Sequence, residues 1–586
     1  MLKIFKYLKP KEWLMAGISL IFIAVQVWLD LKIPDYMSKI TRLTQTPGSA
    51  MSDIWLNGGY MLLCALGSLV AAITVGFFAA KIAAQFSQRL RSLLFNKVES
   101  FSMEEINRFS TSSLITRSTN DITQVQMLIV MGLQLVIKAP ITAIWAITKI
   151  ADKGFEWSVV TGTAVLIMVL MVTLLMIFVI PRFKKMQTLT DNITRVTREN
   201  LTGLRVVRAY NAESYQEDKF ETANEELTST QMFTNRAMAI MMPVMSMLMS
   251  GLSLAIYWVG AYLIDAAGAI DKLTVFSNMV VFSQYAMQVI MSFMMLVMIF
   301  IMLPRASVSA KRINEVLDTE PNILDGTETE GKPGIVGQVE FRSVSFKYPD
   351  AAEPVLENIS FTAKQGETVA FIGSTGSGKS TLINLVPRFF DATDGEILID
   401  GVNVKDYKME ALFNKIGYVP QKAVLFRGTI KSNVAYGDNG SEEYSEGEVR
   451  RAVQIAQSTD FVEKMDGGYE ASIAQNGANI SGGQKQRLAI ARAVCRKPEI
   501  YVFDDSFSAL DYKTDRILRS VLKKETSGVT SLIVAQRIGT IMDADQIIVL
   551  DEGKIVGKGT HKELLRECTV YREIAMSQLS EEELAS

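Results

Sequence analysis

The chain reads Gly373-Ser374-Thr375-Gly376-Ser377-Gly378-Lys379-Ser380-Thr381 directly after an apolar, β-branched run at 368–372. A glycine-rich loop between a strand and a helix presents backbone N–H groups to phosphate oxygens, and the helix dipole favours an anion there. At this spacing Lys379 reaches the β- and γ-phosphates, and the hydroxyl of Ser380 binds Mg²⁺. These nine residues are therefore predicted to bind ATP together with Mg²⁺.

A second apolar run, at 500–503, ends at the acidic pair Asp504 and Asp505. In phosphate-loop proteins the carboxylate after such a strand holds Mg²⁺, here Asp504 acting through water. The strand, the loop, the helix and the downstream carboxylate together argue against a chance match to the loop pattern. We expect an α/β phosphate-loop nucleotide-binding domain at 336–586.

Between these two strands lies the run Ile480-Ser481-Gly482-Gly483-Gln484. Here the sequence resembles the ATP-binding-cassette (ABC) family, and the resemblance extends over nearly the whole chain. It implies that Ser481, Gly482, Gly483 and Gln484 face the γ-phosphate of ATP held by an opposite cassette, so that two cassettes enclose two nucleotides. The residue types agree, because a serine and two glycines before a helical run leave backbone donors exposed.

Three further positions take their roles from the same resemblance. Tyr348 stands where the family stacks an aromatic ring on adenine, and Asp511 stands in a loop that touches the opposite cassette. Gln421 stands where a glutamine contacts Mg²⁺ and senses the membrane domain. The implied magnesium ligands are thus Ser380, Gln421 and Asp504. Taken alone, Tyr348 also fits a half-buried strand position and Gln421 a solvated loop.

Two catalytic positions depart from the family pattern. Asp505 occupies the place of the glutamate that polarises the attacking water, and Gln536 occupies the place of a histidine. The aspartate side chain is one methylene shorter than that of glutamate, so its carboxylate lies about 1 Å farther from the attacking water. Such a displacement is enough to remove most of the roughly 10²–10⁴-fold contribution of a general base. A glutamine can hydrogen-bond but cannot carry charge. With Asp505 and Gln536 as catalytic residues, this site is predicted to hydrolyse ATP slowly.

The signature run is intact although the catalytic pair is altered. Such a cassette is most useful opposite a different one, so we expect a heterodimer with a second ABC half-transporter that carries Glu and His. This chain would be the degenerate-site subunit. Its single histidine, His561, lies far downstream and is expected at an exposed helix start. The alternatives are a homodimeric exporter of lipid or peptide that tolerates aspartate, and an ATP-binding regulator or channel that does not pump.

The long apolar stretches of the sequence lie in its first half. Of the 586 residues, 49% are hydrophobic and 21% are charged. Six apolar stretches are long enough to cross a bilayer, and they lie at 13–34, 54–80, 127–149, 157–181, 238–264 and 273–303. We expect an α-helical membrane domain at 1–303, with six transmembrane helices and long cytoplasmic extensions, and an acidic, turn-rich linker at 304–335.

Basic residues gather before the first span, between the second and third, and after the fourth, as at Lys3, Arg89, Arg117 and Lys185. Because basic loops stay in the cytoplasm, both termini are expected there. The chain is then a multi-pass protein of a plasma membrane, of bacterial type, with the lipid bilayer as a partner. A net charge of −2 excludes a strongly basic surface for nucleic acid.

Mixed-charge segments that favour helix separate the spans on the cytoplasmic side. The resemblance implies that they carry short coupling helices near 102–113 and 209–218, which dock on the cassettes. Solvated charged helices without a coupling role are the alternative.

Methionines concentrate in the fifth and sixth spans, as at Met245 and Met294. Flexible, polarizable side chains suit a cavity that accepts several apolar shapes, and they equally suit packing. Ionisable groups are costly inside a membrane, so Asp30 and Lys138 are candidates for the substrate path unless they pair between helices. The expected function is ATP-driven export of amphipathic or apolar, multidrug-like small molecules.

Overall fold

A computed structural model describes residues 2–46, 48–151, 154–268, 271–349, 351–439 and 444–579. Two compact units are present. The first combines Met1–Glu99 with Ser112–Thr319, and the second combines Ser100–Thr111 with Glu320–Ser586. The short segment Ser100–Thr111, between the second and third membrane-spanning helices, therefore belongs to the same unit as the C-terminal ATPase.

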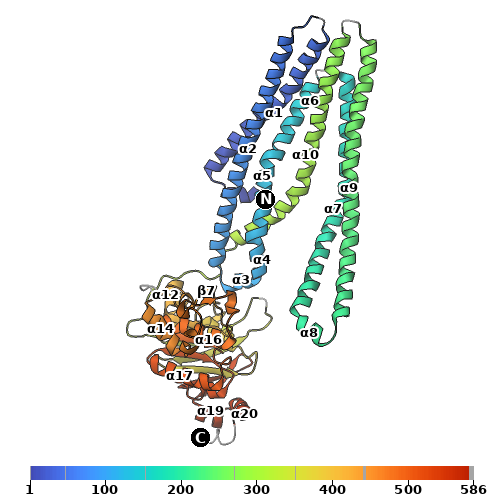
Figure 1. Cartoon of the computed structure of the whole chain (residues 1–586). Helices are drawn as coiled ribbons and strands as arrows, with labels where there is room; N and C mark the ends of the chain where they lie inside the picture. Colours follow the sequence, from blue (N-terminus) through green and yellow to red (C-terminus); the bar gives the residue numbers. More distant parts are fainter. Residues whose placement is uncertain are drawn as a thin grey trace. The chain divides into compact units, whose positions relative to one another are not determined.

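The first unit is entirely helical in its described part (Figure 1). After the 3₁₀ helix η1 (Leu2–Tyr7) come α1 (Pro10–Gln45), α2 (Met51–Glu99), α4 (Thr111–Thr116), α5 (Ile122–Met131), α6 (Lys138–Ala151), α7 (Phe155–Thr202), α8 (Leu204–Ala209), α9 (Glu213–Ala266) and α10 (Lys272–Asp318), with π-helical turns η2 (Arg117–Asp121) and η3 (Gly132–Val136) between α4 and α6. Six helical stretches among the described residues are long and apolar enough to cross a membrane. The predicted six-helix membrane domain is confirmed.

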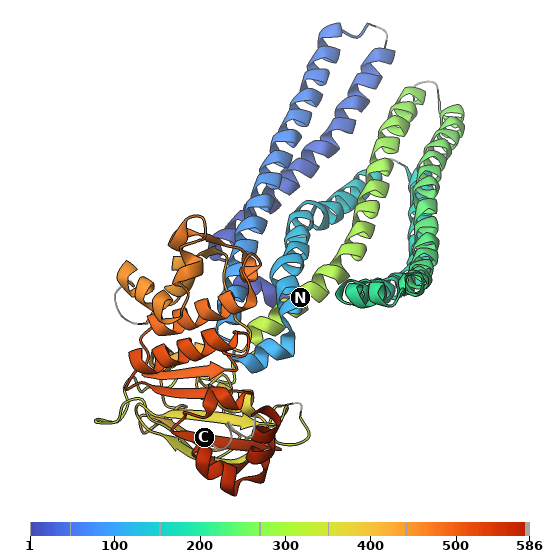
Figure 2. The same ribbon diagram turned by 60° about the horizontal axis from the view of Figure 1, so that its bottom comes forward.

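These long helices pack side by side in hairpins. Helix α1 lies along α2 and α7 lies along α9, while α10 packs against α6 (Figures 1 and 2). Their shared core includes Trp157, Phe282 and Tyr285, each at most 2% exposed. Large apolar side chains such as Trp55 and Phe77 face outward instead, 74% and 61% exposed. A helix that is apolar on its outer face as well as its inner face is suited to lipid rather than water.

Two short helices interrupt the long ones at positions close to those expected for coupling helices. Helix α3 (Met103–Phe109) is capped by Ser102, whose hydroxyl and backbone N–H both donate to Glu105 Oε2, at 2.6 and 2.7 Å. The other carboxylate oxygen of buried Glu105 accepts from the backbone N–H of Asn322 at 3.0 Å. Glu105 thus joins α3 to the start of the ATPase within the second unit.

The other short helix lies earlier than the range 209–218 expected for it. Helix α8 ends at Ala209 because Asn211 adopts a left-handed conformation, and residues from Glu213 onward already belong to α9. The expected linker 304–335 also differs from the structure, because helix α10 continues through its first part, 304–318. The segment after α10 is irregular and contains the helix-breaking residue Pro321.

The second unit is built on two sheets. One is antiparallel, with strand order β2-β1-β4-β5, formed by β1 (Val339–Phe346), β2 (Leu356–Ala363), β4 (Asp394–Ile399) and β5 (Val402–Asn403). The other has the order β12-β11-β3-β10-β9-β6, formed by β3 (Thr368–Gly373), β6 (Ile416–Val419), β9 (Ile500–Asp504), β10 (Thr530–Val534), β11 (Gln546–Asp551) and β12 (Lys554–Gly559). Strands β9 and β10 are buried along their whole length, as central parallel strands with both faces covered must be.

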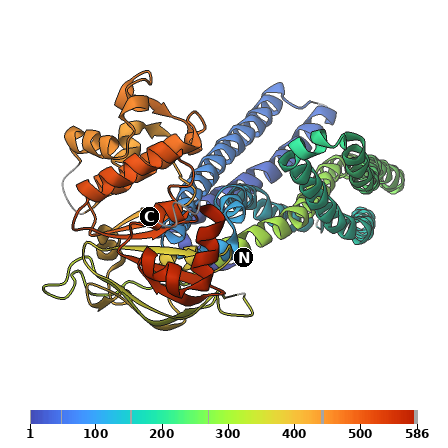
Figure 3. The ribbon, with the colours of Figure 1, turned by 90° about the horizontal axis from the view of Figure 1, so that it is seen from below.

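Helices cover these sheets (Figures 2 and 3). They are α11 (Lys379–Leu385), α12 (Met409–Lys415), α13 (Ile430–Val434), α14 (Glu446–Ile455), α15 (Thr459–Val462), α16 (Gly482–Cys495), α17 (Tyr512–Glu525), α18 (Ile538–Ile541), α19 (His561–Glu567) and α20 (Thr569–Gln578), with 3₁₀ turns η4 (Gly468–Glu470) and η5 (Gln475–Gly477). A short ribbon pairs β7 (Gly428–Thr429) with β8 (Ser472–Ile473). The predicted α/β ATPase domain is confirmed.

His561 connects the two C-terminal helices. It begins α19, as expected, but it is half-buried, and its Nδ1 lies 2.7 Å from the hydroxyl of buried Tyr571 in α20. Burial lowers the pKa of His561; Lys562 lowers it further, and Asp543 acts against both. A histidine whose folded pKa is depressed stabilises the fold fully above its unfolded pKa of about 6.5, and this stabilisation is lost as the pH falls through the folded pKa.

We therefore expect α19 and α20 to loosen on acidification. The protection factors of the amides of 561–578, which compare the observed exchange rates with the intrinsic rates at each pH, should fall between roughly pH 7.5 and pH 5.5. His561→Phe should remove this pH dependence. An equally pH-dependent protection in that variant would contradict the role of the imidazole.

Candidate nucleotide-binding site

Four neighbouring parallel strands bring the predicted site residues to one edge of the sheet. Val534 of β10 lies level with Phe371 of β3 and Asp504 of β9, and Val419 of β6 lies level with Phe503. The ends of these strands and the segments that follow them carry the phosphate-binding run 373–381, Gln536, the acidic pair and Gln421. Ligands of open α/β sheets bind at the carboxyl ends of the strands, which is where these groups meet.

The phosphate-binding loop is preformed. Gly376 and Gly378 have φ values of 87° and 93°, and a Cβ on Gly378 would lie 2.7 Å from Cδ2 of Leu356. The Lys379 ammonium group donates to the carbonyl oxygens of Gly373 and Ser374 at 2.9 and 2.6 Å. Burial lowers the pKa of Lys379, whereas the carboxylates at 505 and 504 oppose this shift. The ammonium group is thus held inside the loop, where phosphate oxygens can replace the carbonyls as its partners.

Oxygen donors suited to Mg²⁺ lie beside the loop. The Ser380 hydroxyl donates to Asp504 Oδ1 at 2.8 Å. Burial raises the pKa of Asp504, and the neighbouring carboxylate of Asp505 raises it further. Hydroxyl and carboxylate oxygens suit a hard cation, but the described residues include no group of three or more His, Cys, Asp or Glu side chains able to hold a metal.

Asp505 is held by two amides. Its Oδ2 accepts from Gln536 Nε2 at 2.8 Å and from Gln421 Nε2 at 3.3 Å. The backbone of Asp505 is left-handed, with φ 45°, and its carbonyl oxygen accepts from the Ser508 hydroxyl at 3.0 Å. Burial raises the pKa of Asp505. The two predicted catalytic residues, Asp505 and Gln536, are therefore in direct contact.

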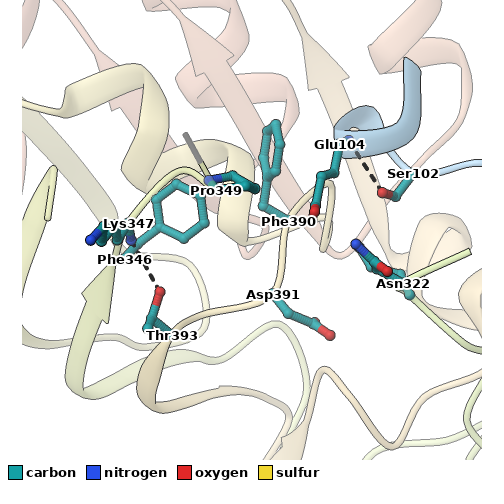
Figure 4. A pocket seen from close by; sticks show the side chains of 10 residues that line it. Ser102, Glu104, Asn322, Phe346, Lys347, Pro349, Phe390, Asp391 and Thr393 are labelled. Atoms are coloured by element: carbon teal, nitrogen blue, oxygen red, sulfur yellow. Dashed lines mark hydrogen bonds between the residues drawn. The ribbon is translucent and has the colours of Figure 1, made fainter. Parts of the chain in front are cut away.

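Tyr348 lies beside the phosphate loop. It is half-buried, its hydroxyl is 3.1 Å from Thr381 Oγ1, and its ring meets Phe390 edge to face at 5.4 Å between centroids. A neighbouring pocket of about 240 Å³ is bounded by Phe346, Pro349 and Phe390 on one side and by the start of α3 on another (Figure 4). The coupling-helix candidate α3 thus borders the same pocket as the residues that flank Tyr348.

The signature residues lie at the start of α16. Ser481 caps α16, and its hydroxyl and backbone form a reciprocal pair of hydrogen bonds with Gln484. A Cβ on Gly482 would meet no atom within 4 Å, whereas a Cβ on Gly483 would lie 3.3 Å from the carbonyl oxygen of Ala509. Asp511 caps α17 by accepting from the backbone N–H of Thr514 at 3.0 Å. Within the described part of the chain, no hydrogen bond joins 481–484 to 373–381.

In the membrane domain, Asp30 and Lys138 form an ion pair between α1 and α6, with Nζ 3.3 Å from Oδ2. Ser68 of α2 also donates to Asp30, at 2.5 Å. A second pair, which the sequence did not predict, links Asp35 and Lys149 of the same two helices at 2.8 Å. The hydroxyl of Tyr285 donates to Asp35 at 2.7 Å. Both aspartates therefore have partners on neighbouring helices.

Known proteins resemble the chain along nearly its whole length. An uncharacterized ABC transporter ATP-binding protein of Mycobacterium tuberculosis is 40% identical over 522 residues, which cover 89% of this chain and 87% of the relative. This chain belongs to the ABC transporter family. Its residues 16–293 match the family model described as ABC transporter transmembrane region, and 356–508 match the family model described as ABC transporter.

Two other relatives and one solved structure agree with this assignment. An uncharacterized ABC transporter of Bacillus subtilis is 36% identical over 590 residues, covering 99% of each chain. An ATP-dependent lipid A-core flippase of Pseudomonas aeruginosa is 31% identical over 506 residues, covering 86% of this chain and 82% of the flippase. A bacterial Atm1-family ABC exporter with ATP bound has the same fold, with a TM-score of 0.79 at 24% identity, covering 98% and 100% of the two chains.

This ABC transporter is an exporter half-transporter that hydrolyses ATP, with one membrane domain followed by one ATPase domain. It is a multi-pass membrane protein with bacterial relatives. The family implies ATP binding in the second unit.

Proposed function

We propose that this chain is the slow-site subunit of a heterodimeric exporter. The observation that supports this most strongly is the contact between Asp505 and Gln536. An aspartate held by a neutral amide is a shorter and less strongly polarised base than a glutamate paired with a histidine, so proton removal from water is slow. The signature residues Ser481–Gln484 are unaltered, Ser481 and Gly482 are exposed, and the run would complete the ATP site of a partner that carries Glu and His.

Each residue of the site then has a defined task. The loop 373–381 and Lys379 bind the triphosphate, while Tyr348 stacks on adenine once its contact with Thr381 opens. Ser380, Asp504 and Gln421 would hold Mg²⁺, which supplies charge neutralisation between the β- and γ-phosphates when bound. Asp505 orients the attacking water, and Gln536 orients Asp505. On the partner's ATP, Ser481 and Asp511 act from the opposite side.

The membrane domain would move apolar or amphipathic compounds outward, with both termini in the cytoplasm. Methionine-rich α9 and α10 suit a cavity of variable shape. The Asp30–Lys138 pair, about a quarter to a third exposed, lies across α1 and α6, where a charged part of a substrate could compete for either partner. Helix α3, fixed to the ATPase by Glu105, is suited to transmit nucleotide-driven movement.

The flippase relative supports a second candidate, a homodimeric exporter of lipid in which aspartate suffices. Purifying the tagged chain in lipid from its native cell distinguishes the two. Negligible ATPase activity alone, together with a co-purifying ABC subunit that carries Glu and His, supports the heterodimer. Robust activity of the chain alone overturns it. ATP turnover without a substrate gradient across vesicles would instead indicate a regulator or channel.

A further inference from the structure

The C-terminal helix of the chain touches the loop that carries Gln536. The side-chain amide of Gln578, in the last turn of α20, makes two hydrogen bonds to this loop. Its Nε2 donates to the carbonyl oxygen of Gln536 at 2.8 Å, and its Oε1 accepts from the backbone N–H of Ile538 at 2.8 Å. One planar side chain therefore spans the backbone on both sides of Arg537.

Helix α20 is well anchored at the position where this contact forms. Tyr571 and Ala575 are fully buried, and residues three and four apart share one face of a helix, so Gln578 follows them on the face that points into the domain. The contact between Tyr571 and His561 ties this face to α19. Gln578 therefore reaches the loop from a fixed helix, and its own amide, although on an exposed residue, is engaged at both ends.

Gln536, which accepts a hydrogen bond from Gln578, is also the residue whose side chain contacts the carboxylate of Asp505. Gln536 Nε2 donates to Asp505 Oδ2 at 2.8 Å. Two hydrogen bonds of equal length thus connect α20 to Asp505 through the backbone carbonyl and the side-chain amide of Gln536, and a third, from the backbone N–H of Ile538 to Gln578, fixes the same loop. Small displacements of a catalytic group are costly for rate, because the efficiency of a general base depends on its reach before its pKa.

We propose that Gln578 is a positioning residue for ATP hydrolysis, which acts on Asp505 through Gln536. It does not touch nucleotide. Its function is to hold the loop after β10 in the position in which the side-chain amide of Gln536 donates to the carboxylate of Asp505. This role concerns the chain's own ATP site, and it holds whether the second cassette belongs to a copy of this chain or to a different polypeptide.

The test measures ATP hydrolysis at this chain's own site, in the intact transporter in lipid. Photoreactive azido-ATP labelled on the γ-phosphate is cross-linked at intervals, and the label that remains on the tagged chain reports hydrolysis there. Gln578→Leu, which keeps the volume without the amide, should slow the loss of label by about three- to tenfold. Gln578→Glu should slow it similarly, because a carboxylate oxygen would replace the N–H that faces the Gln536 carbonyl. Ser577→Ala, on the adjacent exposed position, is the matched control and should hydrolyse at the wild-type rate.

A double-mutant cycle separates positioning from mere stabilisation. In a Gln536→Ala background the link to Asp505 is already absent, so adding Gln578→Leu should change hydrolysis by less than about twofold. The initial cross-linking yield, which reports nucleotide binding, and the melting temperature should stay close to wild type in the single variants. Wild-type hydrolysis in Gln578→Leu, or an equal loss with and without Gln536, would overturn the proposal.

Discussion

Ser481→Arg in this chain should remove nearly all ATP turnover of the assembled transporter, whereas Lys379→Ala should leave most of it. In the heterodimer proposed here, Ser481 serves the partner's fast site, and Lys379 serves only this chain's slow site. Loss of one preorganised donor to transition-state charge typically costs roughly 10²–10³-fold, so we expect a loss of about 100-fold for Ser481→Arg. For Lys379→Ala, we expect turnover to fall by less than about threefold. The measurement is steady-state phosphate release in lipid, with both subunits present.

The two variants control for each other. Ser481 is exposed at a helix N-cap, and losing such a cap typically costs about 1 kcal/mol of stability, so the altered subunit should still assemble. Lys379→Ala should bind no azido-ATP on this chain, which confirms that its own site is disabled. Equal losses of turnover from both variants would contradict the division of labour and would favour two equivalent sites.

Asp505→Glu combined with Gln536→His should raise hydrolysis at this chain's own site by about 100-fold. The longer carboxylate reaches the water, and the imidazole can carry the charge that the Gln536 amide cannot. Asp505→Glu alone should give less than about a tenth of this gain, since Gln536 remains. Loss of γ-phosphate label from this chain measures the rate directly.

A folding defect would lower nucleotide binding as well as hydrolysis, so the initial cross-linking yield is the control for the double variant. A full gain from Asp505→Glu alone would show that the missing methylene is the sole defect. No gain in the double variant, with binding preserved, would place the block elsewhere, for example in the signature that the partner supplies.

Much of the ATP site could be predicted because its parts are local. Phosphate binding needs a strand, a glycine turn and a helix start in sequence, and the carboxyl ends of parallel strands then bring Asp504, Gln421 and Gln536 to the same edge. The spans could be predicted from length and apolarity alone. The phosphate loop and each span are patterns that the chain displays within a few tens of residues, whereas the roles of Gln421 and Gln536 were implied by the family resemblance.

The remainder depends on contacts between distant segments. Nothing near Gln578 in the sequence distinguishes it from a solvated helix end, and only the packing of α20 brings it to Gln536. Asp35 and Lys149 lie at the ends of apolar runs, where ionisable residues are common, so their pairing could not be inferred from composition. The helical course of 304–318 was missed because an acidic, turn-rich segment follows it directly.

The ATPase is, in its covalent connectivity, a discontinuous domain. Residues Ser100–Thr111 belong to it although α1 and α2 precede them and the remaining membrane helices follow. A fragment that begins at Glu320 would therefore lack one of the domain's own helices and would leave the backbone N–H of Asn322 without the Glu105 carboxylate. Conversely, a single proteolytic cut after Thr319 should not release the cassette, because α3 would remain bound to it while still joined to the membrane half by the chain on both sides.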